Sequence, residues 1–105
     1  MASSPNGGQT FQVHASQVIA KELRRIQRRA TQEGRGETVL SALRAILQGL
    51  TLNPRRFGEP LYNLPNLRLQ IRSVVVLPIS MHFAVSQTRP DVYIKGVELL
   101  DPPAS

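Results

Sequence analysis

The chain has 105 residues, which suits a single domain, and it contains no Cys. The lack of Cys excludes a disulfide framework, a thiol nucleophile and a Cys-based zinc site, and the two His residues are too few to form a metal site by themselves. The 13 Lys and Arg residues outnumber the 7 Asp and Glu residues, which gives a net charge of +6. Eleven of the 13 cations are Arg, whose planar guanidinium group suits phosphate and carboxylate, so a polyanion or an acidic protein is the expected partner.

Residues 1–10 are small, polar and rich in Gly and Pro, so we expect a disordered leader without a secretion signal. The longest nearly apolar run, residues 74–79, is too short to cross a bilayer. We therefore expect a soluble cytoplasmic protein with one domain over residues 11–100 and a short tail over residues 101–105.

Residues 11–14 alternate between apolar and polar side chains, which predicts a short strand. Ser16 can cap the helix that follows, because its hydroxyl can accept a backbone N–H group of the first turn. Apolar residues at helical spacing predict one helix over about residues 17–32 and a second over about residues 37–48. Glycines separate the two helices, and the short connection predicts an antiparallel helical hairpin.

Residues 55–60 are expected to form a loop, since Pro residues and a basic pair interrupt the apolar pattern there. Three strands are predicted after this loop, over residues 67–77, 79–85 and 92–95, the last of them reaching as far as residue 99 at most. The first strand must join this sheet after the helical excursion. The order predicts an α+β fold with two helices packed on one face of a small, mostly antiparallel, four-stranded sheet.

Side chains alternate between the two faces of a strand, so an apolar set on one face implies a polar set on the other. If Leu67, Leu69 and Ile71 pack on the helices, the polar residues that alternate with them lie on the open face of the sheet. That face then gathers six polar side chains, which are Arg68, Gln70, Arg72, His82, Tyr93 and Lys95. The assignment requires that Pro78 does not shift the register, because a slip of one residue inverts every position.

Cleavage of RNA at its own 2′-OH needs a base, cations for the charge on phosphorus, and an acid for the leaving oxygen. The open face offers His82 as the base, Arg68 or Arg72 as the cation, and Tyr93 or Lys95 as the acid. This chemistry needs no metal or other cofactor. The alternative is ordinary solubility, because every antiparallel sheet with one wet face shows alternating polar residues. No role is assigned to His14.

The first predicted helix carries a run of cations opposite its apolar stripe, namely Lys21, Arg24, Arg25, Arg28 and Arg29. This run predicts a surface that binds RNA or an acidic partner, and the Arg55–Arg56 pair extends it. The alternative is a solvated helix face. Gln70 is grouped with these residues as a candidate for contacting RNA.

The order of a strand, a helical hairpin and further strands resembles the RelE/ParE superfamily of type II toxins. Three segments carry the resemblance. Phe11-Gln-Val-His-Ala-Ser16 is similar to the family's first strand and Ser helix start. Asn53-Pro-Arg-Arg-Phe-Gly-Glu-Pro-Leu-Tyr-Asn-Leu64 is similar to the loop before its sheet. Leu67-Arg-Leu-Gln-Ile-Arg72 is similar to a strand with alternating basic residues. The resemblance covers residues 11–100.

The resemblance implies a toxin that a cognate antitoxin protein neutralises. RelE-like members cleave messenger RNA in the ribosomal A site without a metal, and ParE-like members inhibit DNA gyrase. Arg68 and Arg72 match the cations of the RNA-cleaving branch, and His82 stands where a second catalytic cation often lies. The stretch 96–103 lacks the Arg, His or Tyr of active members, so only Tyr93 and Lys95 can substitute. A ribosome-dependent mRNA endonuclease is expected; a gyrase inhibitor and a degenerate, non-toxic member are the alternatives.

Overall fold

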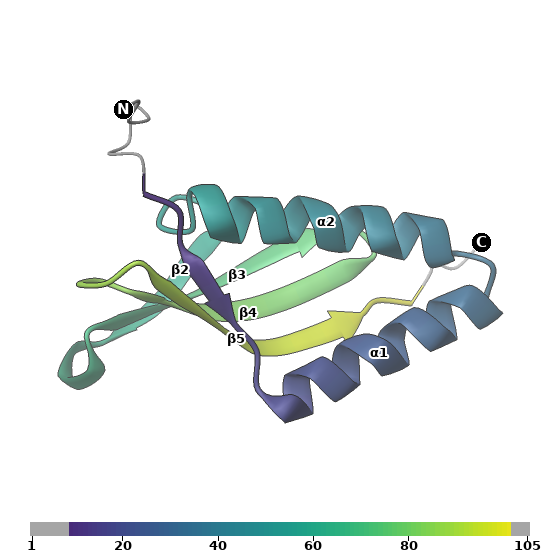
Figure 1. Cartoon of the computed structure of the whole chain (residues 1–105), viewed down its shortest axis with the longest axis horizontal. Helices are drawn as coiled ribbons and strands as arrows, with labels where there is room; N and C mark the ends of the chain where they lie inside the picture. The colour runs from purple at the N-terminus through teal and green to yellow at the C-terminus, as the bar shows by residue number, and fades with distance from the viewer. Residues whose placement is uncertain (1–8, 102–105) are drawn as a thin grey trace.

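Two antiparallel helices cover one face of a five-stranded sheet in the computed structural model, which describes residues 9–101 (Figure 1). The chain begins with β1 (Gln12–His14), α1 (Gln17–Gln32) and α2 (Gly36–Leu52). It continues with β2 (Glu59–Leu64), the short 3-10 helix η1 (Pro65–Leu67), β3 (Leu69–Val76), β4 (Ile79–Ser86) and β5 (Asp91–Leu99). The α+β class and the helical hairpin are confirmed. Residues 1–8 of the predicted leader and residues 102–105 of the predicted tail lie outside the described residues.

The sheet has the strand order β1-β5-β4-β3-β2, so the prediction of four strands was wrong. The pair β1–β5 is parallel and the other three pairs are antiparallel, which agrees with a mostly antiparallel sheet. The missed strand is β2, whose start was expected to be loop. Its side chains are mostly exposed and do not alternate regularly, and it contains Pro60, which a sheet tolerates on an edge strand.

The two helices differ in how much of their surface they bury. The N-terminus of α1 is capped as predicted, because the Ser16 Oγ accepts the backbone N–H of Ile19 at 3.2 Å. This helix buries a narrow stripe made of Ile19, Ile26 and Ala30. The more apolar α2 buries a wider surface that includes Leu43, Ile46 and Leu50, together with Val39 and Ala42. No helix in the described part of the chain has the length and apolar character needed to span a membrane.

The core lies between these helices and one face of β3, β4 and β5, and Phe83 stands at its centre with no exposed surface. The loop between α2 and β2 is anchored to this core by Phe57, whose ring centroid lies 6.4 Å from that of Phe83. Gly49 on α2 makes room for this ring, because a Cβ at that position would lie 2.5 Å from Phe57. Phe57 therefore holds the loop that precedes β2 against the core.

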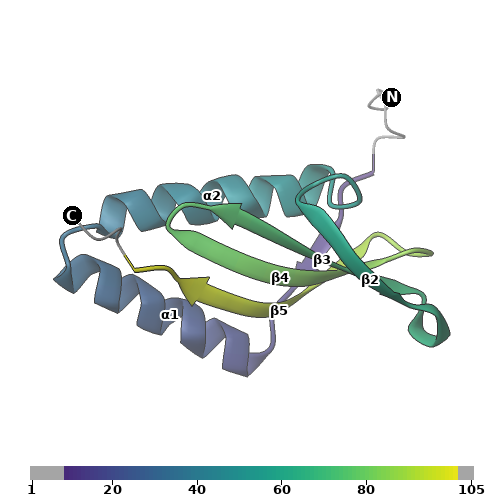
Figure 2. The ribbon, with the colours of Figure 1, turned by 180° about the vertical axis from the view of Figure 1, so that it is seen from behind.

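The register of β3 is the main departure from the prediction. Arg72 pairs with Phe83 and Val74 pairs with Met81, so the even-numbered side chains of β3 face the helices. Leu69 and Ile71 consequently lie on the opposite side, and Leu67 lies before the strand, in η1, where it is exposed. The prediction that these three residues face the helices was wrong. Figure 2 views the molecule from this opposite side, which is called the helix-free face below.

The alternation that suggested the wrong register has a structural cause. Leu69 pairs with Leu64 and Ile71 pairs with Tyr62, so the start of β3 forms a small apolar surface with β2 on the helix-free face. An apolar set can therefore alternate on the side away from the helices, where Ile71 is buried and Leu69 is half-buried. The predicted faces of β4 and β5 are confirmed, because Met81, Phe83, Val85, Val92 and Ile94 all belong to the core.

Candidate functional site

Arg72 lies on the helix side of the sheet and is only 5% exposed. Its Nε donates to the carbonyl of Phe57 at 2.9 Å and its Nη2 donates to the carbonyl of Gly58 at 3.0 Å. Its Nη1 donates to the Gln70 Oε1 at 2.8 Å. Burial lowers the pKa of Arg72 from its usual value. The expected place of Arg72 on the open face was therefore wrong, since the side chain holds the loop before β2 against the sheet.

Two more residues expected on the open face lie elsewhere. Arg68 adopts a left-handed backbone conformation with φ of 52° in the turn after η1, and its carbonyl accepts the backbone N–H of Gln87 at 2.9 Å. It therefore lies at the tip of the β2–β3 hairpin and not within a strand. Gln70 is half-buried, pairs with Val85 in register and shares the helix side with Arg72. The predicted row of polar side chains along β3 is not formed.

The remaining predicted catalytic residues do lie together. His82 and Tyr93 are exposed on the helix-free face, because their neighbours in sequence, Phe83 and Val92, point into the core. The β4–β5 register shifts at this place, where Phe83 pairs with Ile94 and His82 pairs with Gly96. Lys95 is the extra residue of this bulge, and its side chain is exposed. Bulges often redirect side chains next to active sites.

A second group on the helix-free face was not predicted. The His14 Nε2 lies 2.9 Å from the Asp91 Oδ1, and the imidazole stacks on Tyr93 with ring centroids 4.9 Å apart and an interplanar angle of 18°. The other carboxylate oxygen of Asp91, Oδ2, lies 3.3 Å from the Arg89 Nε. The sequence did contain a usable signal. If Val13 and Val92 face the core, alternation places His14, Asp91 and Tyr93 on the opposite face. Only the parallel β1–β5 register, however, reveals that they meet.

The five cations predicted on α1 fall into two sets. Arg25 pairs with Glu22 at 2.9 Å, and Arg29 pairs with Glu33 at 3.0 Å and with Asp101 at 2.9 Å. Hydrogen bonds to these carboxylates raise the pKa of Arg29. The other set, called the free stripe, is Lys21, Arg24 and Arg28. None of its members has a side-chain partner within residues 9–101.

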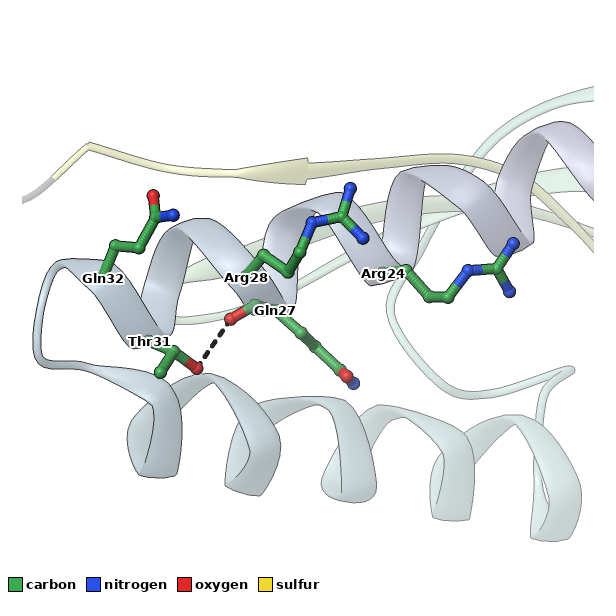
Figure 3. A pocket seen from close by; sticks show the side chains of 5 residues that line it. All are labelled: Arg24, Gln27, Arg28, Thr31 and Gln32. Carbon is green, nitrogen blue, oxygen red and sulfur yellow. Dashed lines mark hydrogen bonds between the residues drawn. The ribbon is translucent and has the colours of Figure 1, made fainter.

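The spacing of three and four residues places the free stripe on one side of α1. Figure 3 shows the guanidinium groups of Arg24 and Arg28 extending in the same direction, while Gln27 and Thr31 lie toward α2. These side chains and Gln32 line a shallow depression of about 490 Å³. A row of unneutralised cations beside amide and hydroxyl groups suits a chain of phosphates.

The predicted basic pair of the loop is divided as well. The Arg55 guanidinium lies 5.0 Å from the ring centroid of Phe11, and its Nη2 donates to the carbonyl of Ser86 at 3.1 Å. Arg55 thus ties the segment before β1 to the β4–β5 turn. Arg56 is exposed and has no side-chain partner among the residues that the structure describes, so it alone stays available for an anion.

Comparisons with protein-family models, with curated proteins and with solved structures found no match for this chain. The fold places it among two-layer α+β proteins with a helical hairpin on a mixed sheet. Across residues 9–101, no three His, Asp or Glu side chains gather as a metal site would require.

Proposed function

We propose that this protein is the toxin of a type II toxin–antitoxin pair, of the RelE/ParE kind, and that it cleaves messenger RNA on the ribosome without a metal ion. The observation that carries the proposal is the exposed group of His82, Tyr93 and Lys95 beside a strand bulge on the helix-free face. The helical hairpin inserted between β1 and the other strands supports the family assignment. A cognate antitoxin is the protein partner that this proposal requires.

The three side chains supply complementary chemistry. The His82 imidazole can donate a proton from a ring nitrogen, so it can protonate the leaving oxygen of a cleaved phosphodiester. The Lys95 ammonium stabilises the negative charge that develops on phosphorus. The Tyr93 ring, on which the His14 imidazole already stacks, is partly exposed, and a base can add to this stack. The free stripe on α1 provides a separate surface for RNA phosphates, so binding and cleavage involve different parts of the molecule.

The departures on β3 change the catalytic assignment. Arg72 uses Nε, Nη1 and Nη2 within the fold, and Arg68 lies at a hairpin tip, so neither is assigned to the reacting phosphate. With no free cation from β3 on the helix-free face, a ParE-like inhibitor of DNA gyrase is the second candidate. That activity requires a protein-binding surface and no acid–base pair.

Inducible expression in a bacterial host tests the proposal, with growth, message integrity and DNA damage as readouts. Growth arrest with cleaved messages is the expected result. His82→Ala should restore growth, whereas Ser80→Ala, on the same strand and face, should remain toxic. Arrest with intact messages and DNA damage would favour the gyrase inhibitor. Normal growth with a folded, soluble protein would contradict the toxin proposal in that host.

A further inference from the structure

The group around Asp91 joins three separate parts of the chain on the helix-free face. His14 comes from β1, Arg89 from the β4–β5 turn, and Asp91 and Tyr93 from β5. The carboxylate of Asp91 contacts one cation-forming group with each oxygen, at 2.9 Å to the His14 Nε2 and 3.3 Å to the Arg89 Nε. Its side chain is 13% exposed, whereas those of His14 and Arg89 are 43% and 77% exposed. A shielded carboxylate therefore holds two accessible groups.

The contacts define which nitrogen of His14 is free to react. An ionised carboxylate only accepts hydrogen bonds, so the Nε2 of His14 carries the proton that it shares with Asp91. In the neutral imidazole the Nδ1 then holds a lone pair, and this atom has no partner within residues 9–101. Stacking on Tyr93 fixes the plane of the ring. An imidazole held in one tautomer by a carboxylate is the arrangement used for general-base catalysis.

The need to hold β1 in place does not account for this group. Backbone pairing of Gln12, Val13 and His14 with β5 already fixes the strand. The backbone N–H of Phe11 also donates to Thr51, and that of Gln12 donates to Pro90, both at 2.8 Å. An exposed ion pair adds little stability to such a strand.

We infer that His14 is the general base of RNA cleavage, that Asp91 positions it, and that Arg89 binds the phosphate being cleaved; this inference rests on the proposed function. The Nδ1 of His14 takes the proton of the ribose 2′-OH as the 2′-oxygen forms a bond to the adjacent phosphorus. The bond from phosphorus to the 5′-oxygen breaks, and that oxygen keeps the electron pair and takes a proton from the His82 imidazolium. The products are a 2′,3′-cyclic phosphate and a 5′-hydroxyl, so protons and electrons balance.

Single-turnover cleavage of a defined message on programmed ribosomes tests this assignment, with ribosome binding measured in parallel. His14→Ala should slow cleavage by about 10²- to 10⁴-fold at saturating protein, the usual contribution of an acid–base group. Added imidazole should restore part of the rate, which a merely structural role does not predict. Asp91→Asn should lower the rate without weakening ribosome binding, and Asp91→Glu should recover part of it. Arg89→Gln should weaken binding and slow cleavage together. Gln12→Ala, on the same strand, is the matched control and should cleave like the wild type.

The possible failures are distinguishable. If the wild type cleaves and His14→Ala cleaves equally fast, the role of His14 is wrong and the proposed function stands. If the wild type leaves the message intact while bound to the ribosome, the proposed function is wrong and the role of His14 falls with it. If His14→Ala fails to fold by circular dichroism, Asp91→Asn decides, and an unchanged rate in that variant overturns the inference.

Discussion

The two faces of the sheet use polar side chains in opposite ways. On the helix side, Arg72 is 5% exposed and its guanidinium donates to Phe57, Gly58 and Gln70. On the helix-free face, the His14 side chain is 43% exposed and keeps one ring nitrogen without a partner in the described chain. The first arrangement satisfies backbone carbonyl groups of the loop before β2, and the second leaves reactive atoms accessible. A basic residue in a strand thus indicates a site only when its hydrogen-bonding groups are not used by the fold.

The largest effect is expected when the Arg72 guanidinium group is removed from the helix side of the sheet. Arg72→Ala leaves the carbonyls of Phe57 and Gly58 without their donor, so the free energy of unfolding should fall by about 3 kcal/mol. Arg72→Lys should not restore it, because an ammonium group cannot reproduce the three donor directions of the guanidinium group. Urea unfolding followed by circular dichroism measures the change. Unchanged stability in both variants would contradict the structural role of Arg72.

On the helix-free face we expect the opposite result, a loss of activity without a loss of stability. His82→Ala should slow message cleavage by about 100-fold, equivalent to about 2.7 kcal/mol of transition-state stabilisation. Its free energy of unfolding should stay within about 0.5 kcal/mol of the wild type, because the side chain is exposed. Parallel cleavage and unfolding measurements check both parts. A variant that loses stability instead of activity would remove the distinction between the two faces.

The third prediction applies the same distinction to α1, where some cations are paired and others free. Arg24→Ala should weaken RNA binding and reduce the slope of log affinity against log salt by about 0.7, as expected for one lost phosphate contact on a single strand. Arg44→Ala, an exposed cation on α2, is the matched control and should leave the slope unchanged. Titrations at several salt concentrations give the slopes. Equal slopes for the two variants would show that the free stripe does not bind phosphate.

The smallest effect concerns the paired cations. Hydrogen bonds from Arg29 and Arg35 lower the pKa of Glu33 below its ordinary value of 4.5. The stabilisation is therefore present above pH 4.5 and is lost as the pH falls through the lower, folded-state value. Glu33→Gln should be slightly less stable than the wild type at pH 7, and the difference should shrink in acid. Thermal unfolding over this pH range measures it, and a difference that grows in acid would contradict the assignment.

Much of the architecture was accessible from local patterns. The first helix was predicted over residues 17–32 and spans Gln17–Gln32, because its narrow apolar stripe and Ser cap are local signals. The second was expected to end near residue 48 and continues to Leu52, since no charge or Pro interrupts it before Asn53. Strand β2 was not predicted because an exposed edge strand needs no regular alternation of apolar and polar side chains.

The site was only partly accessible. Composition and alternation determined that the chain is basic, that α1 has a cationic side, and that His82 and Tyr93 point away from the core. Only the tertiary structure decided which cations are neutralised by carboxylates. It alone also decided that Arg72 is buried. It also brought His14 to Asp91, residues 77 positions apart in the sequence. The physical reason is that alternation divides the side chains of a strand into two sets but does not tell which set faces the core. The side is settled only when neighbouring strands pair and one set of side chains enters the core.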